Sequence, residues 1–284
     1  AVRPLRDGVI ADFDAAEQMI KTFIQKCNEG KGIVAPRIVI GIPSGVTSVE
    51  RRAVREAGLA GAREVHLIDE PVAAAIGASL PVTEPIGTMI VDIGGGTTEV
   101  AVLSLGGTVL SESVRIAGDE INESITSYLK KVHNLVVGER TAEEIKIKIG
   151  SAFPDDDFDK TTLEVRGLHL LSGLPRSITL TSGEIREAMA DTLIKIVEAV
   201  KRTLERTPPE LAADIVERGI MLAGGGALVR GINDLLSNET GIFTHIAENP
   251  LLCVVNGCGE VLDDFKKLKR VVDTPDFTSN AIRN

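Results

Sequence analysis

Residues 92–98 combine one acidic side chain, three glycines and two threonines at the junction of two apolar runs. Glycines allow the backbone to adopt positive φ angles and to bring bare N–H groups close to an anion. A carboxylate and hydroxyl groups beside such a turn can hold Mg²⁺ through water and orient phosphate oxygens. The pattern predicts a phosphate-binding β-hairpin formed by Asp92, Gly94, Gly95, Gly96, Thr97 and Thr98.

This stretch is not a Walker A loop, because no Gly-Lys-Ser/Thr follows the glycines and no helix starts at them. Taken alone, it is also compatible with a tight hairpin that carries a glycine bulge. A second cluster favours ligand binding: the apolar run 220–223 leads into Gly224, Gly225, Gly226 and Ala227, before a helix expected over 226–238. Two such turns predict a single nucleotide-like ligand, with one turn at its phosphate end and the other at its nucleoside end.

An acidic pair lies at the end of another expected strand, 64–68, where Asp69 and Glu70 precede a helix. The carboxyl ends of parallel strands are where α/β proteins place ligands. A carboxylate there can align or deprotonate a water molecule that attacks a γ-phosphate. The alternative is helix capping by Asp69 or Glu70. The two interpretations are compatible, since one residue can cap the helix while the other faces the nucleotide.

Further polar residues begin two expected helices in the second half of the chain. Gly118 and Asp119 open a helix over 119–133, where a plain N-cap is the alternative for Asp119. Glu143 and Lys146 are three residues apart and therefore share one helix face. Their default interpretation is an ion pair on a solvated helix.

Composition restricts the function classes. The 284 residues carry a net charge of −10 without a basic block, which argues against a nucleic-acid partner. There is neither an apolar run of about 18 residues nor a signal-peptide pattern, so a soluble, cytoplasmic protein is expected. The three cysteines fit reduced thiols, and the four histidines share no ligand spacing, so no metal site made directly by protein side chains is expected.

Apolar periodicity predicts an α/β protein whose core is built from Ile, Val, Leu and Ala. A β-α-β unit is expected over 37–68, and a three-stranded meander over 87–92, 97–104 and 108–116. Strands at 161–166 and 176–181 are expected to belong to a small inserted subdomain. Long helices are expected over 184–206, begun by a capping box at Thr181, and over 250–265.

Several motifs combine into a resemblance that covers nearly the whole chain. The two glycine turns resemble those of the actin, sugar-kinase and heat-shock-chaperone ATPase superfamily. The chain is most similar to its MreB branch, the rod-shape-determining bacterial actins. This closer resemblance is carried by the segments 3–10, 70–77 (Glu-Pro-Val-Ala-Ala-Ala-Ile-Gly), 116–120, 138–143, 207–211 and 217–220.

The resemblance implies an actin-like (ribonuclease-H-like) α/β fold with a nucleotide cleft between two lobes. Residues 1–13 would be a remnant of a small subdomain, and residues 14–84 with 260–284 the core of lobe I. Residues 85–120 with 185–259 would form the core of lobe II, into which 121–184 is inserted. The first phosphate loop of the superfamily has no counterpart here, so lobe I is expected to be incomplete at its N-terminus and ATP binding and hydrolysis impaired.

The resemblance also implies residue roles. Glu70 would be the catalytic glutamate, with Thr97 helping to hold the attacking water. The hairpin at Asp92 to Thr98, with Gly118 and Asp119, would bind phosphates, and Mg²⁺ would be held through the nucleotide and water with Asp92 nearby. The adenosine would lie against Glu143, Lys146, Gly224, Gly225, Gly226 and Ala227. Ile33 and Val34 would dip into the membrane, or alternatively anchor a buried loop.

The implied function is an ATP-dependent cytoskeletal filament protein and weak ATPase that determines rod shape. It would assemble with itself into antiparallel double protofilaments at the inner face of the cell membrane, and act with cell-elongation and wall-synthesis proteins. A monomeric chaperone-type ATPase and a kinase-type ATPase of the same superfamily are the alternatives. The first of these normally carries a long peptide-binding domain, and the second needs an acceptor-binding carboxylate.

Overall fold

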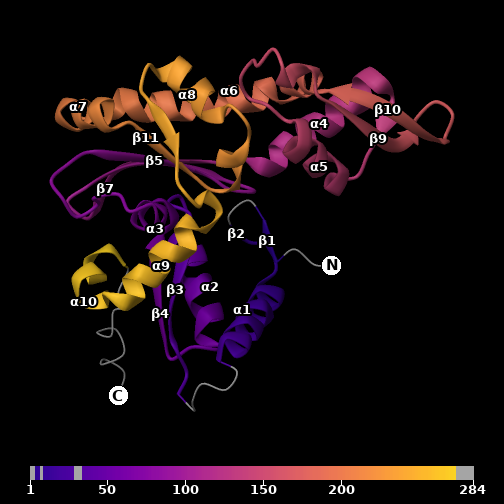
Figure 1. Ribbon diagram of the computed structural model, residues 1–284. Coiled ribbons are helices and arrows are strands. Elements are labelled where there is room, and N and C mark those ends of the chain that lie inside the picture. The colour runs from indigo at the N-terminus through magenta and orange to yellow at the C-terminus, as the bar shows by residue number, and fades with distance from the viewer. Residues whose placement is uncertain (1–3, 7–8, 29–33, 273–284) are drawn as a thin grey trace.

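A five-stranded mixed sheet is the centre of the computed structural model, which describes residues 4–6, 9–28 and 34–272 (Figure 1). Its strand order is β12-β11-β5-β6-β7. The meander of β5, β6 and β7 is antiparallel, as predicted, while β11 pairs with β5 and β12 with β11 in parallel. The strands are β5 (Thr88–Ile93), β6 (Thr98–Ser104), β7 (Gly107–Val114), β11 (Ile220–Ala223) and β12 (Thr244–Ile246).

Helices cover both faces of this sheet, which explains why β5 and β6 are apolar along almost their whole length. Because side chains alternate along a strand, Met89 and Val91 enter one core, whereas Ile90 enters the other. The first core includes α4 (Gly118–His133), α6 (Ser182–Arg206), α7 (Pro209–Arg218) and α8 (Ile232–Thr240). The second includes α3 (Glu70–Gly77) and α9 (Cys253–Asp263).

A two-stranded parallel sheet, β3 (Arg37–Ile42) with β4 (Glu64–Asp69), lies below the large one in Figure 1. The helices α1 (Phe13–Asn28) and α2 (Ser48–Leu59) contribute Ile24 and Val54 to its core. A capping box of Thr47 and Glu50 begins α2. The short hairpin of β1 (Leu5–Arg6) and β2 (Val9–Ile10) was not predicted, because strands this short show no periodicity.

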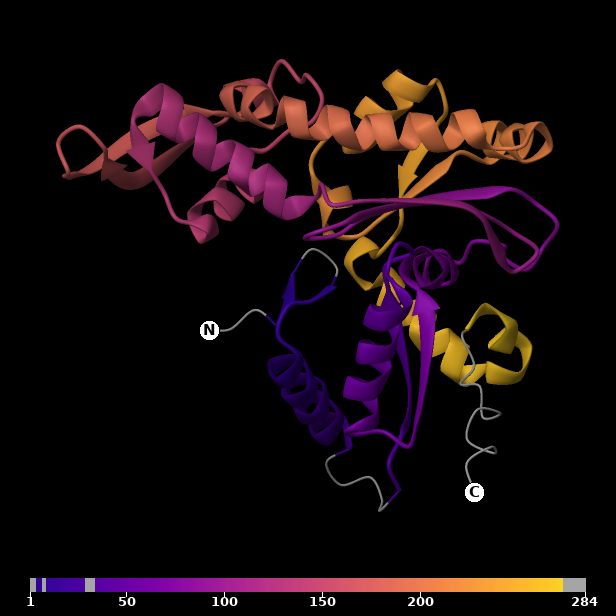
Figure 2. The ribbon, with the colours of Figure 1, turned by 180° about the vertical axis from the view of Figure 1, so that it is seen from behind.

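The helices α3 and α9 cross between the two sheets at a distance that only glycine permits (Figure 2). A Cβ atom at Gly77 would overlap the carbonyl oxygen of Cys253, and one at Gly257 would overlap that of Ala73. Cys253 and Cys258 are buried on α9, where they pack in the second core as small apolar side chains. A short helix, α10 (Phe265–Leu268), follows. Within the described residues, no helix has the length and apolar character needed to cross a membrane.

A small three-stranded sheet lies beside the large one, with α5 (Glu139–Ile149) next to it (Figure 1). It consists of β8 (Leu135–Val136), which was not predicted, β9 (Thr162–His169) and β10 (Pro175–Thr181). The predicted capping box is present, since Thr181 Oγ1 accepts from the Glu184 amide and Glu184 accepts from the Thr181 amide.

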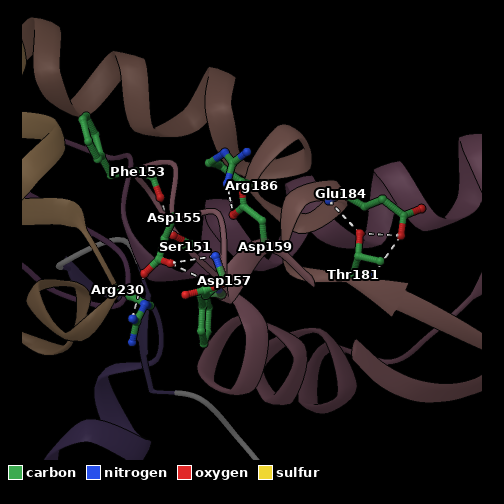
Figure 3. A network of polar contacts seen from close by, with 10 residues as sticks. Ser151, Phe153, Asp155, Asp157, Asp159, Thr181, Glu184, Arg186 and Arg230 are labelled. Atoms are coloured by element: carbon green, nitrogen blue, oxygen red, sulfur yellow. Dashed lines mark hydrogen bonds and ion pairs between the residues drawn. The ribbon is translucent and has the colours of Figure 1, made fainter. Parts of the chain in front are cut away.

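Polar contacts fasten the segment after α5 to α6 and to the loop before α8 (Figure 3). Arg230 lies 2.9 Å from Asp155, and its carbonyl oxygen accepts from the Ala152 amide at 2.7 Å. Arg186 of α6 pairs with Asp159 in the short helix η1 (Phe158–Lys160). These contacts hold residues 152–159 against α6 and against the loop before α8.

Two predicted helices are interrupted. The prediction of one helix over 226–238 was wrong, because Gly231 has a φ of 72° and separates η2 (Gly225–Leu228) from α8. The prediction of one helix over 250–265 was also wrong, since η3 (Pro250–Leu252) precedes α9 and Asp264 separates α9 from α10. Both interruptions place short 3₁₀ segments beside the site described next.

Candidate functional site

A cleft of about 770 Å³ is bordered by residues of α3, α4 and α5, by the glycine turns after β5 and β11, and by the start of α9. It brings together almost every residue predicted to bind a nucleotide, although they come from distant parts of the chain. The predicted residues that line it are Glu70, Asp92, Gly94, Gly95, Gly96, Thr97, Gly118, Asp119, Glu143, Lys146, Gly224, Gly225 and Gly226. Its volume lies within the range of small-molecule sites.

The first glycine turn exposes backbone donors to this cleft. The Gly94 amide closes the turn on the Thr97 carbonyl at 2.9 Å, and the amides of Gly118 and Asp119 bond to the carbonyls of Gly94 and Gly95. In the described part of the chain the amides of Gly95 and Gly96 have no hydrogen-bond partner. A Cβ atom on Gly95 would meet nothing within 4 Å. Unused N–H groups beside open space suit an anionic ligand.

The start of α4 corrects one alternative. Asp119 is not the N-cap: that position belongs to Ala117, whose amide donates to the Glu120 carboxylate at 2.8 Å. Asp119 lines the cleft instead. At the start of α3, Asp69 occupies the N-cap position, but its side chain makes no capping hydrogen bond. Its carboxylate lies 3.2 Å from Arg51 instead.

Thr98 is not part of the cleft, in contrast to its neighbour Thr97. The Thr98 side chain is fully buried, and its hydroxyl donates to the Ile116 carbonyl at 2.7 Å. Successive side chains of a strand point to opposite faces, so only one of the two threonines can face a ligand. The other holds β6 to the segment that leads into α4.

The second glycine turn packs tightly against the first. Because β11 is parallel to β5, Ala223 is in register with Asp92. Gly224 has a φ of 79° and a ψ of 170°, a conformation essentially restricted to glycine. A Cβ atom there would overlap Asp92 and Ile93, and one on Gly226 would overlap Ile93. Ala227 is fully buried in the core and does not line the cleft.

Two carboxyl groups in the cleft are strongly perturbed. Burial raises the pKa of Glu70 to about 8, with smaller contributions from the charges of Asp92, Glu99 and Asp69. Burial likewise raises the pKa of Asp92 to about 7, with a contribution from Glu99. Among the described residues no cationic side chain forms an ion pair with Glu70 or Asp92. Buried acids without a counter-charge favour a cationic ligand and are frequent at functional sites.

Helix α5 contributes the cation of the site. Lys146 Nζ donates to the Gly118 carbonyl at 3.1 Å, beside the first glycine turn, and no ion pair between Lys146 and Glu143 is present in the described structure. Burial lowers the pKa of Lys146, while the charges of Glu143 and Asp119 act in the opposite direction. The solvated-helix interpretation of this pair is therefore wrong for Lys146, which lies in the cleft.

Sequence reasoning missed the apolar rim of the cleft and a buried acid behind it. Ile147, Leu228 and Leu251 line the cleft although their side chains are 74%, 58% and 66% exposed. Glu99, only 1% exposed, lies in β6 opposite Asp92. Periodicity gives no signal for either feature, because both depend on which elements meet in space.

The predicted membrane loop lies only partly within the described residues. Val34 is 70% exposed and precedes β3. The alternative of a buried anchor is therefore wrong for Val34. Ile33 lies outside the described residues.

The site can bind a polyanion that carries a planar or apolar end group. The free amides of the first turn and Lys146 can bind the anionic end of such a ligand. The exposed apolar side chains border the space for the rest of it. Glu70 and Thr97 provide a carboxylate and a hydroxyl beside the free amides, a combination that can orient a water molecule toward a phosphate.

Comparison with known proteins agrees with this geometry. The family described as MreB/Mbl protein matches residues 1–270. The cell shape-determining protein MreB of Escherichia coli K12 is 53% identical over 265 residues, which cover 93% of this chain and 76% of that protein. The cell shape-determining protein Mbl of Bacillus subtilis 168 is 48% identical over 272 residues, 95% of this chain and 81% of that protein.

Solved structures extend the likeness to the fold. A crystal structure of MreB5 of Spiroplasma citri bound to ADP superposes with a TM-score of 0.88 at 35% identity, covering 95% of this chain and 80% of that one. This likeness shows the predicted actin-like α/β fold, in which a cleft lies between two lobes. On the strength of both the sequence and the fold, the chain belongs to the MreB/Mbl family.

Proposed function

We propose that the chain binds Mg-ATP in the cleft and hydrolyses it slowly as a subunit of a cytoskeletal filament that determines cell shape. The observation that carries this proposal is the meeting of both glycine turns with Glu70 and Lys146 in one cleft. It is supported by relatives that are named cell shape-determining proteins and by the ADP bound to the related MreB5 structure.

In the proposed complex the phosphates lie against the free amides of Gly95 and Gly96, with Lys146 nearby. The ribose and adenine lie between Glu143, Ile147 and the turn at 224–226. Asp92 is buried and has no cationic partner in the described structure, which fits a hydrated Mg²⁺ close by. This ion would offset the charge of the phosphates, and Glu70 with Thr97 would hold the attacking water.

We assign one proposed lobe to each of the two sheets. Lobe I contains the β3–β4 sheet with α1, α2 and α10, and lobe II contains the five-stranded sheet and the small inserted subdomain. A nucleotide bound between them would favour one relative orientation of the lobes, and hence a subunit shape that assembles. Hydrolysis would then weaken the contacts between subunits.

At the cellular level we propose antiparallel double protofilaments on the inner face of the cell membrane, where they organise cell-wall synthesis together with elongation proteins. Membrane contact is assigned to the loop with Ile33 and Val34, and the exposure of Val34 supports it. The protein would therefore be cytoplasmic and peripherally attached.

The test combines nucleotide titration, phosphate release, and pelleting with negative-stain microscopy, each with Mg-ATP and with and without anionic vesicles. Paired filaments that require Mg-ATP and lie on the vesicles are expected. Binding and turnover without assembly would replace this proposal by a chaperone-type or kinase-type ATPase. Absence of nucleotide binding would refute the assignment of the cleft.

A further inference from the structure

A buried carboxylate behind the cleft connects the two lobes. Glu99 is 1% exposed and lies opposite Asp92 in the β5–β6 pair, so both side chains point to the sheet face that carries α3 and α9. It does not line the cleft, and the proposed nucleotide contacts do not use it. A buried ionisable group of this kind needs partners.

The two oxygens of Glu99 accept hydrogen bonds from different lobes. Oε1 accepts from the Ser113 hydroxyl on β7 at 2.6 Å, within lobe II. Oε2 accepts from the backbone amide of Ser44 at 3.1 Å, in the turn that follows β3 of lobe I. The next residue, Gly45, packs against Ser113: a Cβ atom on it would lie 3.4 Å from Ser113 Cβ.

This contact lies close to both proposed water-holding groups. Ile42 at the end of β3 is in register with Asp69, the residue before Glu70, and Ser44 follows Ile42 by two residues. In lobe II, Glu99 lies in β6 and follows Thr97, the residue just before β6, by two residues. The hydrogen bond from Ser44 to Glu99 therefore joins the edge of lobe I that carries Glu70 to the hairpin of lobe II that carries Thr97.

We propose that Glu99 is a positioning residue that holds the turn after β3 against the β5–β6 hairpin, and thereby sets the position of Glu70 relative to Thr97. The inference rests on the proposed hydrolysis of ATP in this cleft. It assigns to a residue outside the cleft the task of keeping Glu70 and Thr97 at a fixed distance from each other.

The charge of Glu99 also acts on Glu70. The groups that face Glu70 are Asp69, Asp92, Glu99 and the Cys258 thiol. Because Glu99 is one of the acids that raise the pKa of Glu70, removal of its charge should lower that pKa. Glutamine separates this effect from the hydrogen bonds: its carbonyl can accept from the Ser44 amide while its amide donates to the Ser113 oxygen.

The experiment compares Glu99→Ala, Glu99→Gln and the control Glu112→Ala. Glu112 is a carboxylate of the neighbouring strand that pairs with Arg202 of α6 on the other face of the sheet. The hydrogen-exchange rate of the Ser44 amide, measured without nucleotide, reports whether its hydrogen bond to Glu99 is intact. Steady-state hydrolysis of Mg-ATP over a range of pH gives kcat, KM and the pH profile.

In Glu99→Ala, Ser44 exchange should accelerate at least about tenfold and kcat fall about 10–100-fold, as expected for misplaced reacting groups, with KM nearly unchanged. Glu99→Gln should keep Ser44 protected and kcat high, but move the midpoint of the pH profile downward. Glu112→Ala should match the wild type in all three readouts.

The inference is overturned if Ser44 exchange in Glu99→Ala equals that of the wild type, or if exchange accelerates while kcat stays at the wild-type value. It is also overturned if Glu99→Gln loses as much kcat as Glu99→Ala, or if KM changes as much as kcat. A wild-type protein that does not hydrolyse ATP refutes the proposed function instead, before any variant is compared.

Discussion

The two glycine turns of the cleft each contain three consecutive glycines but use them for different physical reasons. In the first turn, Gly95 has open space where a side chain would begin. In the second, Gly224 and Gly226 are pressed against Asp92 and Ile93 of the neighbouring strand. The first turn leaves its amides free for a ligand, whereas the second allows β11 and η2 to approach β5.

This difference teaches that a glycine-rich motif alone does not reveal which role each glycine has. Glycine at an open position keeps backbone donors accessible, and substitution there should act on ligand binding. Glycine at a crowded position with positive φ is required by the fold, and substitution there should act on stability. The comparison can therefore be tested by measuring binding and unfolding separately for each position.

The largest effect is expected for Gly224→Ala. Its backbone conformation is strained for any residue with a Cβ, and the new methyl group would overlap the Ile93 carbonyl. The free energy of unfolding should fall by at least about 3 kcal/mol, measured by urea denaturation. A fully stable variant that only binds nucleotide less tightly would contradict the packing role of the second turn.

The next effect concerns Glu70, which interacts with the two acids that flank the first turn, Asp92 and Glu99. If the first turn holds the phosphates, Glu70→Gln should lower the rate of Mg-ATP hydrolysis about 100-fold without comparable loss of affinity. Because burial raises the pKa of Glu70 to about 8, wild-type hydrolysis should increase as pH rises toward 8. A variant that keeps the wild-type rate and pH profile would exclude Glu70 as the proton acceptor.

The same pKa predicts a gain in stability for this variant without ligand. Between its ordinary value of 4.5 and about 8, folded Glu70 keeps a proton that the unfolded chain loses, so stability decreases as pH rises through this interval. Glu70→Gln removes this decrease. Its Tm should exceed that of the wild type at pH 8 and approach it near pH 5, as measured by calorimetry.

Local signals predicted the two glycine turns and the acid after β4, whereas Glu143 and Lys146 were placed in the site only by the family resemblance. A strand that ends in an acid, a run of glycines and a helix start are each visible within about ten residues. Glu99 was missed because its partner Ser44 is 55 residues away. The break of the helix over 226–238 was missed because nothing local shows that Gly231 adopts a left-handed conformation, where a Cβ would crowd Phe153 at 2.8 Å.

Gly95→Ala should produce a smaller change that is confined to binding. The added methyl group meets no protein atom within 4 Å, so the free energy of unfolding should stay within about 0.5 kcal/mol of the wild type. The methyl group would project where the phosphates are proposed to lie, and affinity for Mg-ATP should fall about tenfold, which corresponds to about 1.4 kcal/mol. Unchanged affinity in a calorimetric titration would show that the phosphates lie elsewhere.

The smallest effect is expected at Gly225, which separates the two roles within the second turn. A Cβ atom there would lie 3.2 Å from Cδ2 of Leu251, a side chain that is 66% exposed and free to move. Gly225→Ala should therefore change the free energy of unfolding by less than about 0.5 kcal/mol, although the neighbouring Gly224→Ala is severe. Parallel urea titrations of the two variants measure this contrast. Similar losses at both positions would mean that the whole turn is intolerant, and that the crowding against β5 does not distinguish its glycines.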